Sequence, residues 1–298
     1  MSDLWPATYT GNAGCPPGVH TLRIRNARTM PRKDCGEVTE ATLRDAVAAL
    51  AARLPLAEPP DAAVAAEECR QAWRPERLRV LLLAESHIAT SDAELACRVA
   101  LPPGLDWPGP RRFVRHIYCA GYGEPELLEG QLESGARPRG GTPQYWRLMA
   151  AAEGADCPAW PAVARQGTAA GPRLAAKAAL LHRLRARGIW LTDASLVALA
   201  VPALRRHGGG GLDALALRES WRLYHSDLLP ALAPAHVAVI GLGVARALGA
   251  ELDRAFPGRW SALRQPNGAR APHHAHEMWM TLASICDCFV PAKNATQG

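Results

Sequence analysis

Short apolar runs that end abruptly in polar residues recur along this chain and predict the strands of a parallel sheet. The run 79–87 reads RVLLLAESH, in which Val and Leu give way to Glu85, Ser86 and His87. Three further runs follow the same design, at 188–193 (GIWLTD), 236–243 (HVAVIGLG) and 260–267 (WSALRQPN). Short continuous apolar runs suit strands that are buried on both faces. Open α/β sheets bind ligands at the carboxyl ends of their strands, so we expect the four polar ends at one site.

Helical periodicity between these runs predicts the helices that cover the sheet. Thr39 is expected to open a helix that carries Leu43, Val47, Leu50 and Leu54 on one face, and Pro55 to stop it. Further helices are expected over 63–73, from 174 to a C-cap at 188, from 213 onward and over 277–286. Strands that alternate with helices predict an α/β fold whose parallel sheet is covered on both faces.

Two segments depart from this alternation. Residues 1–37 are rich in Pro, Gly, Arg and Thr without a clear period, and we expect an extended N-terminal arm. Residues 38–298 are then a single domain, interrupted by a Pro- and Gly-punctuated insertion at about 91–172. Within it, 113–119 (FVRHIYC) is either a strand or an ordered loop, and 125–131 and 143–152 are expected to be short helices. Such an insertion is where a ligand lid or a DNA-gripping surface is expected.

Composition narrows the class of protein. The chain has 298 residues, of which 48% are hydrophobic, enough for a substantial core. Its formal charge of +6 is compatible with nucleic acid but does not require it. Arginine clusters such as Arg111–Arg112 suit contacts to phosphates, and an ordinary solvated surface is the alternative. The eight cysteines are irregularly spaced, and neither a signal peptide nor an apolar membrane span is apparent. We therefore expect a reduced, cytoplasmic protein without membrane contact.

Three familiar motifs are only partly present. Gly241 and Gly243 fit the first two places of a G-x-G-x-x-G dinucleotide motif, but Arg246 holds the third, so a tight strand-to-helix turn is the simpler interpretation. The histidines around His273 lie near two cysteines without the paired spacing of zinc modules. No Walker sequence and no G-x-S-x-G elbow occur. We therefore expect neither a cofactor nor a metal.

Glu85, His87 and Asp193 are the strongest chemical candidates. All three follow apolar strands, so two carboxylates and an imidazole are expected to orient a polar ligand or a water molecule. The alternative for Glu85 is a structural role as an acceptor for backbone N–H groups of the next loop.

The order of these strand ends resembles the uracil-DNA glycosylase superfamily over about 200 residues, from Leu78 to the last helix. That family ends its first strand in motifs such as G-Q-D-P-Y or G-E-x-P-G, and LLLAESHIA places Glu85 at the Gln or Glu position. The base-stacking aromatic corresponds to Tyr118 or Tyr122, and the Asn that reads the uracil edge corresponds to Asp193. RQPNGARAP occupies the place of the H-P-S motif with Gln265, Pro266 and Asn267. Ser86 replaces the water-activating acid, His87 the proline and Gln265 the catalytic histidine, which implies a divergent branch with rearranged chemistry.

The resemblance implies a three-layer α/β/α sandwich on a four-stranded parallel sheet. It also implies a monomeric, monofunctional uracil-DNA glycosylase of base-excision repair, which flips uracil out of DNA, hydrolyses its N-glycosidic bond and leaves an abasic site. DNA containing uracil is the implied partner and free uracil the product. The implied catalytic residues are Glu85, His87, Asp193 and Asn267, and the base contacts are Ala84, Ser86, Tyr118, Tyr122 and Asp193. The implied DNA contacts are Gln265, Pro266, Gly268, Arg270, Arg111 and Arg112.

In this interpretation Glu85 and His87 place or activate water, and Asn267 or His273 donates to the developing oxyanion. An ionised Asp193 accepts from uracil N3–H but repels O4, so either the carboxyl is protonated or backbone groups read the base. Alanine at Glu85, His87 or Asp193 is expected to slow uracil release and to leave the fold intact. Two other functions remain open, a catalytically silent nucleic-acid-binding module and a small-molecule hydrolase that uses the same crevice.

Overall fold

The computed structural model describes residues 40–129, 143–164, 168–200, 210–265 and 272–290. Its centre is a four-stranded parallel sheet in the order β4-β1-β5-β6. The strands are β1 (Val80–Ala84), β4 (Ile189–Asp193), β5 (His236–Ile240) and β6 (Trp260–Leu263). Every residue of β1, β4 and β5 is buried, which explains why their sequences are mostly apolar and do not alternate with polar residues.

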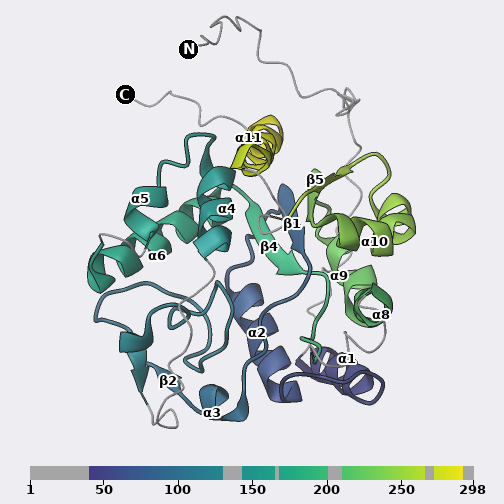
Figure 1. The fold of residues 1–298 in the computed structure, drawn as a ribbon, viewed down its shortest axis with the longest axis horizontal. Coiled ribbons are helices and arrows are strands. Elements are labelled where there is room, and N and C mark those ends of the chain that lie inside the picture. Colours follow the sequence, from purple (N-terminus) through teal and green to yellow (C-terminus); the bar gives the residue numbers. More distant parts are fainter. Residues whose placement is uncertain (1–39, 130–142, 165–167, 201–209, 266–271, 291–298) are drawn as a thin grey trace, which may run out of the picture.

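Helices cover both faces of this sheet (Figure 1). On one side α4 (Pro143–Glu153) packs on α6 (Ala170–Ala186) and α11 (Pro272–Phe289), and α5 (Trp160–Val163) joins them. On the other side lie α8 (Gly210–Ser220), a π-helical turn at Trp221–His225, α9 (Ser226–Ala231) and α10 (Leu242–Ala255). The molecule is therefore a three-layer α/β/α sandwich, which confirms the predicted fold class.

Two helices precede the sheet. They are α1 (Glu40–Ala51) and α2 (Pro60–Ala72), which pack on each other, and α1 also contacts α8. Their buried side chains join the single hydrophobic core that runs through the sheet and the insertion. The N-terminal arm expected over 1–37 lies outside the described residues.

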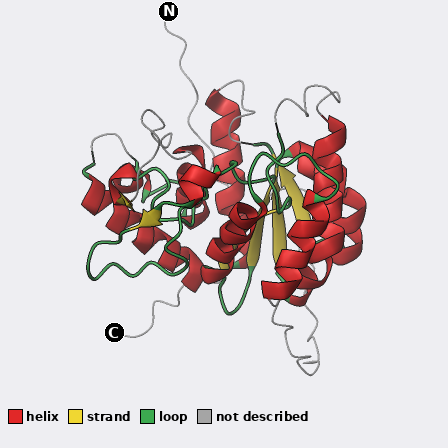
Figure 2. Cartoon of the chain, turned by 90° about the horizontal axis from the view of Figure 1, so that it is seen from below, coloured by secondary structure: helices red, strands yellow, loops and turns green. Residues whose placement is uncertain are grey.

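The insertion is more irregular than the sequence indicated. It contains α3 (Asp92–Leu95) and a two-stranded ribbon of β2 (Arg98–Val99) and β3 (Leu128–Glu129), which lies apart from the main sheet (Figure 2). The segment 113–119 is an ordered loop, not a strand. The helix predicted from Pro125 is only a 3-10 turn, Pro125–Leu127, that leads into β3. The last helix is longer than the predicted 277–286.

Candidate functional site

The ends of all four strands meet at one edge of the sheet, as their sequence pattern predicted. Ala84 pairs with Asp193 in the register of β1 and β4, and the Glu85 carbonyl accepts from the Ser195 N–H at 2.9 Å. Gln265 follows β6 and donates from its side-chain Nε2 to the Glu85 carboxylate. A Cβ at Gly241, after β5, would lie 3.2 Å from the Gln265 side chain. These contacts bring Glu85, Asp193 and Gln265 to the same edge.

A fully buried arginine organises the polar groups behind this edge. Arg70, on α2, is 0% exposed and donates four hydrogen bonds. It reaches Glu67 Oε2 and Asp193 Oδ2 at 2.6 Å each, His87 Nδ1 at 2.9 Å and His116 Nε2 at 3.2 Å. Burial opposes its charge, but the carboxylates of Asp193 and Glu67 outweigh that effect and raise the pKa of Arg70 above its usual value. Arg70 therefore stays charged and holds Asp193, His87 and His116 in one arrangement.

Sequence reasoning missed Arg70 and Glu67. They lie three residues apart in an Ala-rich segment, AAVAAEECRQAW, where a charged pair is ordinarily assigned to a solvated helix face. The available signal was their placement among small apolar residues, because every residue of α2 from Ala62 to Glu67 is buried.

His87 is fully engaged with protein groups. Arginine only donates, so His87 Nδ1 accepts from Arg70 and its Nε2 donates to Glu58 Oε1 at 2.7 Å. Glu58 is buried and also accepts from the backbone N–H groups of Thr90 and Ala198. With both ring nitrogens bound, His87 orients the neighbouring side chains. In this arrangement neither ring nitrogen of His87 is free for water, and its role in handling water stays a prediction.

A small cavity lies in front of this polar layer. It is lined by the aromatic side chains Tyr122, Tyr145 and Trp146, by Ile88, Ile117 and Leu191, and by the polar residues Ser86, His87, Arg115, His116 and Asp193. Its volume of about 30 Å³ is room for roughly two water molecules. Burial and the charge of Arg70 lower the pKa of His116 well below its usual range, so this imidazole is neutral at the cavity wall.

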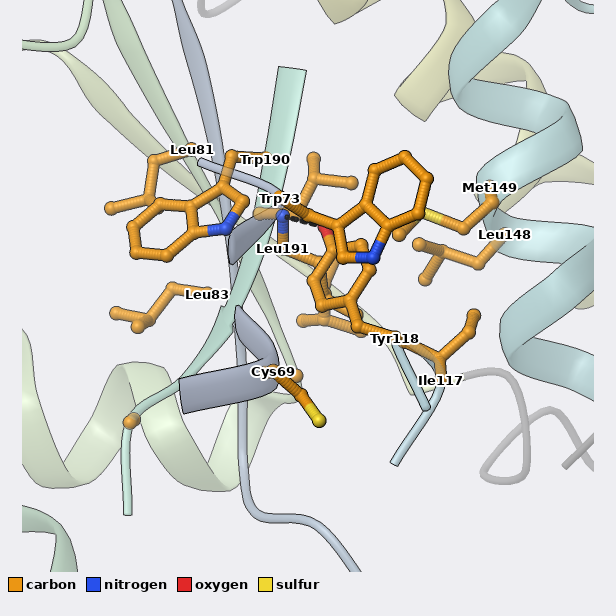
Figure 3. Close-up of a cluster of buried hydrophobic side chains, with 14 of the residues drawn as sticks. Cys69, Trp73, Leu81, Leu83, Ile117, Tyr118, Leu148, Met149, Trp190 and Leu191 are labelled. Atoms are coloured by element: carbon orange, nitrogen blue, oxygen red, sulfur yellow. Dashed lines mark hydrogen bonds between the residues drawn. The ribbon is translucent and has the colours of Figure 1, made fainter. Parts of the chain in front are cut away.

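Of the two tyrosines predicted to stack on a base, only Tyr122 lines the cavity. Tyr118 lies in the hydrophobic core, stacked on Trp73 at 6.1 Å between ring centroids (Figure 3). Its hydroxyl accepts from the N–H of Leu191 at 3.0 Å and so satisfies a backbone group on the outer side of the edge strand β4. Tyr118 thus lies in the core with its hydroxyl engaged, whereas Tyr122 is the predicted base contact that lies at the cavity. Ala84, fully buried within β1, likewise lines no described cavity.

Tyr145, at the start of α4, is the aromatic residue that the sequence did not single out. Its side chain is partly exposed to the cavity, and its pKa is raised, first by burial and then by the charges of Asp193 and Glu85 and by Tyr122. The carboxylates at the ends of β1 and β4 therefore both disfavour ionisation of the Tyr145 hydroxyl.

Glu85 opens onto a second, larger cleft of about 410 Å³ on the other side of His87. Ser86, His87 and Ile88 line both spaces and separate them. Glu85 is partly exposed, and its carboxylate accepts a hydrogen bond from the side chain of Gln265. The alternative, structural role of Glu85 was to accept from backbone N–H groups of the next loop.

The predicted DNA contacts are divided between two places. Arg111 and Arg112 line a groove of about 670 Å³ together with Arg44, Arg98 and the acidic residues Asp61, Glu68 and Asp92. The same loop continues to Arg115 and His116 at the cavity, so one segment connects groove and cavity. Pro266, Asn267, Gly268 and Arg270 lie outside the described residues, as does the side chain of His273.

Neither a protein-family model nor a curated protein sequence matches this chain. Within the described ranges, no three His, Cys, Asp or Glu side chains are grouped so that they could hold a metal ion. None of the helices in these ranges combines the length and the apolar character that crossing a lipid bilayer demands.

Proposed function

We propose that this protein is a DNA glycosylase that receives a flipped base between Tyr122 and Tyr145 and hydrolyses its N-glycosidic bond, with uracil as the base that the sequence resemblance implies. The observation that supports this most directly is the aromatic cavity at the carboxyl ends of β1 and β4, with the buried carboxylate of Asp193 in its wall. Enzymes that act on a flipped base hold it between aromatic or apolar side chains and bind its edge with a few polar groups.

In this proposal the side chains have separate tasks. Tyr122 and Tyr145 contact the faces of the base, and Asp193 meets its edge. Glu85, the partly exposed carboxylate, orients a water molecule toward the sugar. The C1′–N bond breaks, the hydroxyl of water joins C1′, and the remaining proton ends on the base. Arg111 and Arg112 contact backbone phosphates, and residues 265–270 contact the DNA as the resemblance implies.

The cavity must widen for this reaction. A volume of about 30 Å³ does not admit a pyrimidine ring, so the proposal requires the side chain of Tyr145 or Tyr122 to swing aside when DNA binds. Flipping costs a few kcal/mol, which is least for a single strand. We therefore expect single-stranded DNA to be the better substrate.

One observation favours the non-catalytic alternative. His87 has no ring nitrogen left for water, and Ser86 stands where the resemblance places an acid, so Glu85 is the remaining candidate to position water. A protein that lacked this function of Glu85 would bind DNA and leave its bases in place.

The deciding experiment uses an end-labelled oligonucleotide with one uracil, incubated with the full chain and then treated with alkali. Strand scission at the uracil supports the glycosylase. Binding that weakens with salt but gives no scission supports the silent module. Glu85→Gln keeps the size of the side chain and should abolish scission, whereas Asp45→Asn removes an exposed carboxylate on α1 and should not. Scission that is undiminished in Glu85→Gln would remove Glu85 from the mechanism.

A further inference from the structure

Asp193 presents an unusual group to a base, a carboxylate that is fixed in place and can only accept hydrogen bonds. Its side chain is 3% exposed, and its Oδ2 is bound by Arg70 at 2.6 Å. Arg70 is itself locked by Glu67, whose other oxygen accepts from Gln71 and Tyr224. Rotation of the carboxylate would break this pair, so Oδ1 is the oxygen that remains for a ligand, and it is an acceptor.

The nearby cations do not change this character, because each is already paired with a carboxylate, although Lys177 shares Glu124 with Arg173. Arg115 lines the cavity, but it donates to Glu94 from its Nε at 2.8 Å. Lys177 lies 4.8 Å from the centre of the Trp146 ring and pairs with Glu124 at 2.6 Å. Arg70 faces Asp193 and Glu67 together, so the pair of acids exceeds its charge.

Two further observations agree with an excess of negative charge at this wall of the cavity. Burial is the largest cause of the raised pKa of Tyr145, and the charges of Asp193 and Glu85 raise it further. No cation is among the causes. Neither ring nitrogen of His87 is left to donate toward the cavity.

The edge of uracil fits this wall poorly. Uracil presents the O4 acceptor beside the N3–H donor, so a carboxylate that accepts from N3–H is held against O4. A base with an amino group at C4 has an unprotonated N3, but its amino group carries an N–H that points away from N3, as in cytosine. Each base can give the carboxylate one charge-assisted hydrogen bond. Uracil N3–H is flanked by the acceptors O2 and O4, whereas the outer amino N–H lets the carboxylate lie away from the N3 acceptor.

We propose that Asp193, held by Arg70, is a specificity-determining residue that selects damaged bases with a 4-amino group over their 4-oxo counterparts. This inference rests on the proposed glycosylase function and refines its substrate class. Uracil remains a substrate, but a slower one. The difference between a matched donor contact and a mismatched one changes the ratio of the rates for two bases by about tenfold or more.

A matched pair of substrates tests this without any variant. 5-Hydroxycytosine and 5-hydroxyuracil differ at C4 and in the protonation of N3 that follows from it, so each is placed at the same position of one single-stranded oligonucleotide. Because the two glycosidic bonds differ in lability, each enzymatic rate is divided by the spontaneous rate of base release from the same oligonucleotide. For wild-type protein this ratio is expected to be about tenfold higher for 5-hydroxycytosine. Equal ratios, or a higher ratio for 5-hydroxyuracil, would overturn the inference.

Asp193→Asn adds a second, independent comparison. The amide supplies a donor for O4, so the preference should shift toward 5-hydroxyuracil by about tenfold or more relative to wild type. For each base the rate of the variant is divided by the rate of the wild type, which cancels the different lability of the two glycosidic bonds. The control Asp45→Asn, on the exposed face of α1, should keep the wild-type ratio. Melting temperatures establish that Asp193→Asn is folded, and an unshifted ratio in folded protein would contradict the role of Asp193.

Failure of the proposed function gives a different result. If uracil is released but the 5-hydroxycytosine preference is absent, the glycosylase stands and the inference fails. If no base is released at all, the glycosylase proposal fails, and fluorescence anisotropy of the two oligonucleotides then measures their dissociation constants. Equal constants would overturn the selectivity of the cavity as well.

Discussion

Replacing Arg70 with methionine should cost far more stability than any surface arginine can. Methionine is apolar and similar in length to arginine, so it fills most of the space that the Arg70 side chain occupies. It leaves the carboxylates of Glu67 and Asp193 without their shared cation, and both are buried, at 0% and 3% side-chain exposure. With so little solvent to screen or hydrate these charges, removing one partner of a buried pair costs about 3–5 kcal/mol.

The magnitude can be checked against a matched arginine. Arg53 also pairs with a carboxylate, Glu219, but its side chain is 52% exposed. An exposed pair contributes about 0–1 kcal/mol, so Arg53→Met should have little effect. Urea unfolding followed by tryptophan fluorescence measures both variants. A further variant, Arg70→Met with Glu67→Gln and Asp193→Asn, removes the stranded charges and should recover much of the loss. Equal, small losses for Arg70→Met and Arg53→Met would refute the buried network as drawn.

Three shorter predictions concern other positions. Burial lowers the pKa of His225 to about 4, against about 6.5 in an unfolded chain. Between these two pH values His225 is therefore protonated in the unfolded state and unprotonated in the folded state. The free energy of unfolding must then fall as pH falls through this window, by about 2 kcal/mol at about pH 5. In His225→Leu the urea midpoint should therefore fall less between pH 7 and pH 5 than it does in the wild type. Gly188 has φ +76°, and a Cβ there would lie 2.5 Å from the Arg77 carbonyl oxygen, so Gly188→Ala should lower the melting temperature, with a cost of about 2 kcal/mol or more. Tyr118→Phe strands the N–H of Leu191 and should cost about 1–3 kcal/mol in urea unfolding, whereas an unchanged midpoint would show that the bond is unimportant.

The sheet was predictable because burial leaves a local record. β1, β4 and β5 are covered on both faces, so each is a short and mostly apolar run. Glu85 after β1, Asp193 at the end of β4 and Gly241 after β5 mark where these runs stop. Glycine gave a second local signal at Gly188, whose positive φ turns α6 into β4. The irregular insertion has no such period, and its ordered loop at 113–119 is held by distant contacts that no local pattern records.

The candidate site was predictable only in part, for the same reason. Glu85 follows β1 and Asp193 ends β4, so parallel register alone brings them together. Arg70 meets His87, His116 and Asp193 across 17, 46 and 123 residues of chain, and nothing local in α2 marks these partners. Long-range charge pairing is therefore the part of the site that needed the structure.

This long-range pairing changes what alanine variants of the site can show. We expected alanine at Glu85, His87 or Asp193 to slow catalysis and spare the fold, but the three positions differ physically. Glu85 is partly exposed and pairs with Gln265, so its loss is tolerable. His87 and Asp193 belong to the layer that Arg70 holds together between α2 and the sheet, and removing either leaves buried polar groups unpaired. A fall in base release for Glu85→Ala therefore reports on chemistry, whereas the same fall for Asp193→Ala reports on chemistry only after the folded fraction has been measured.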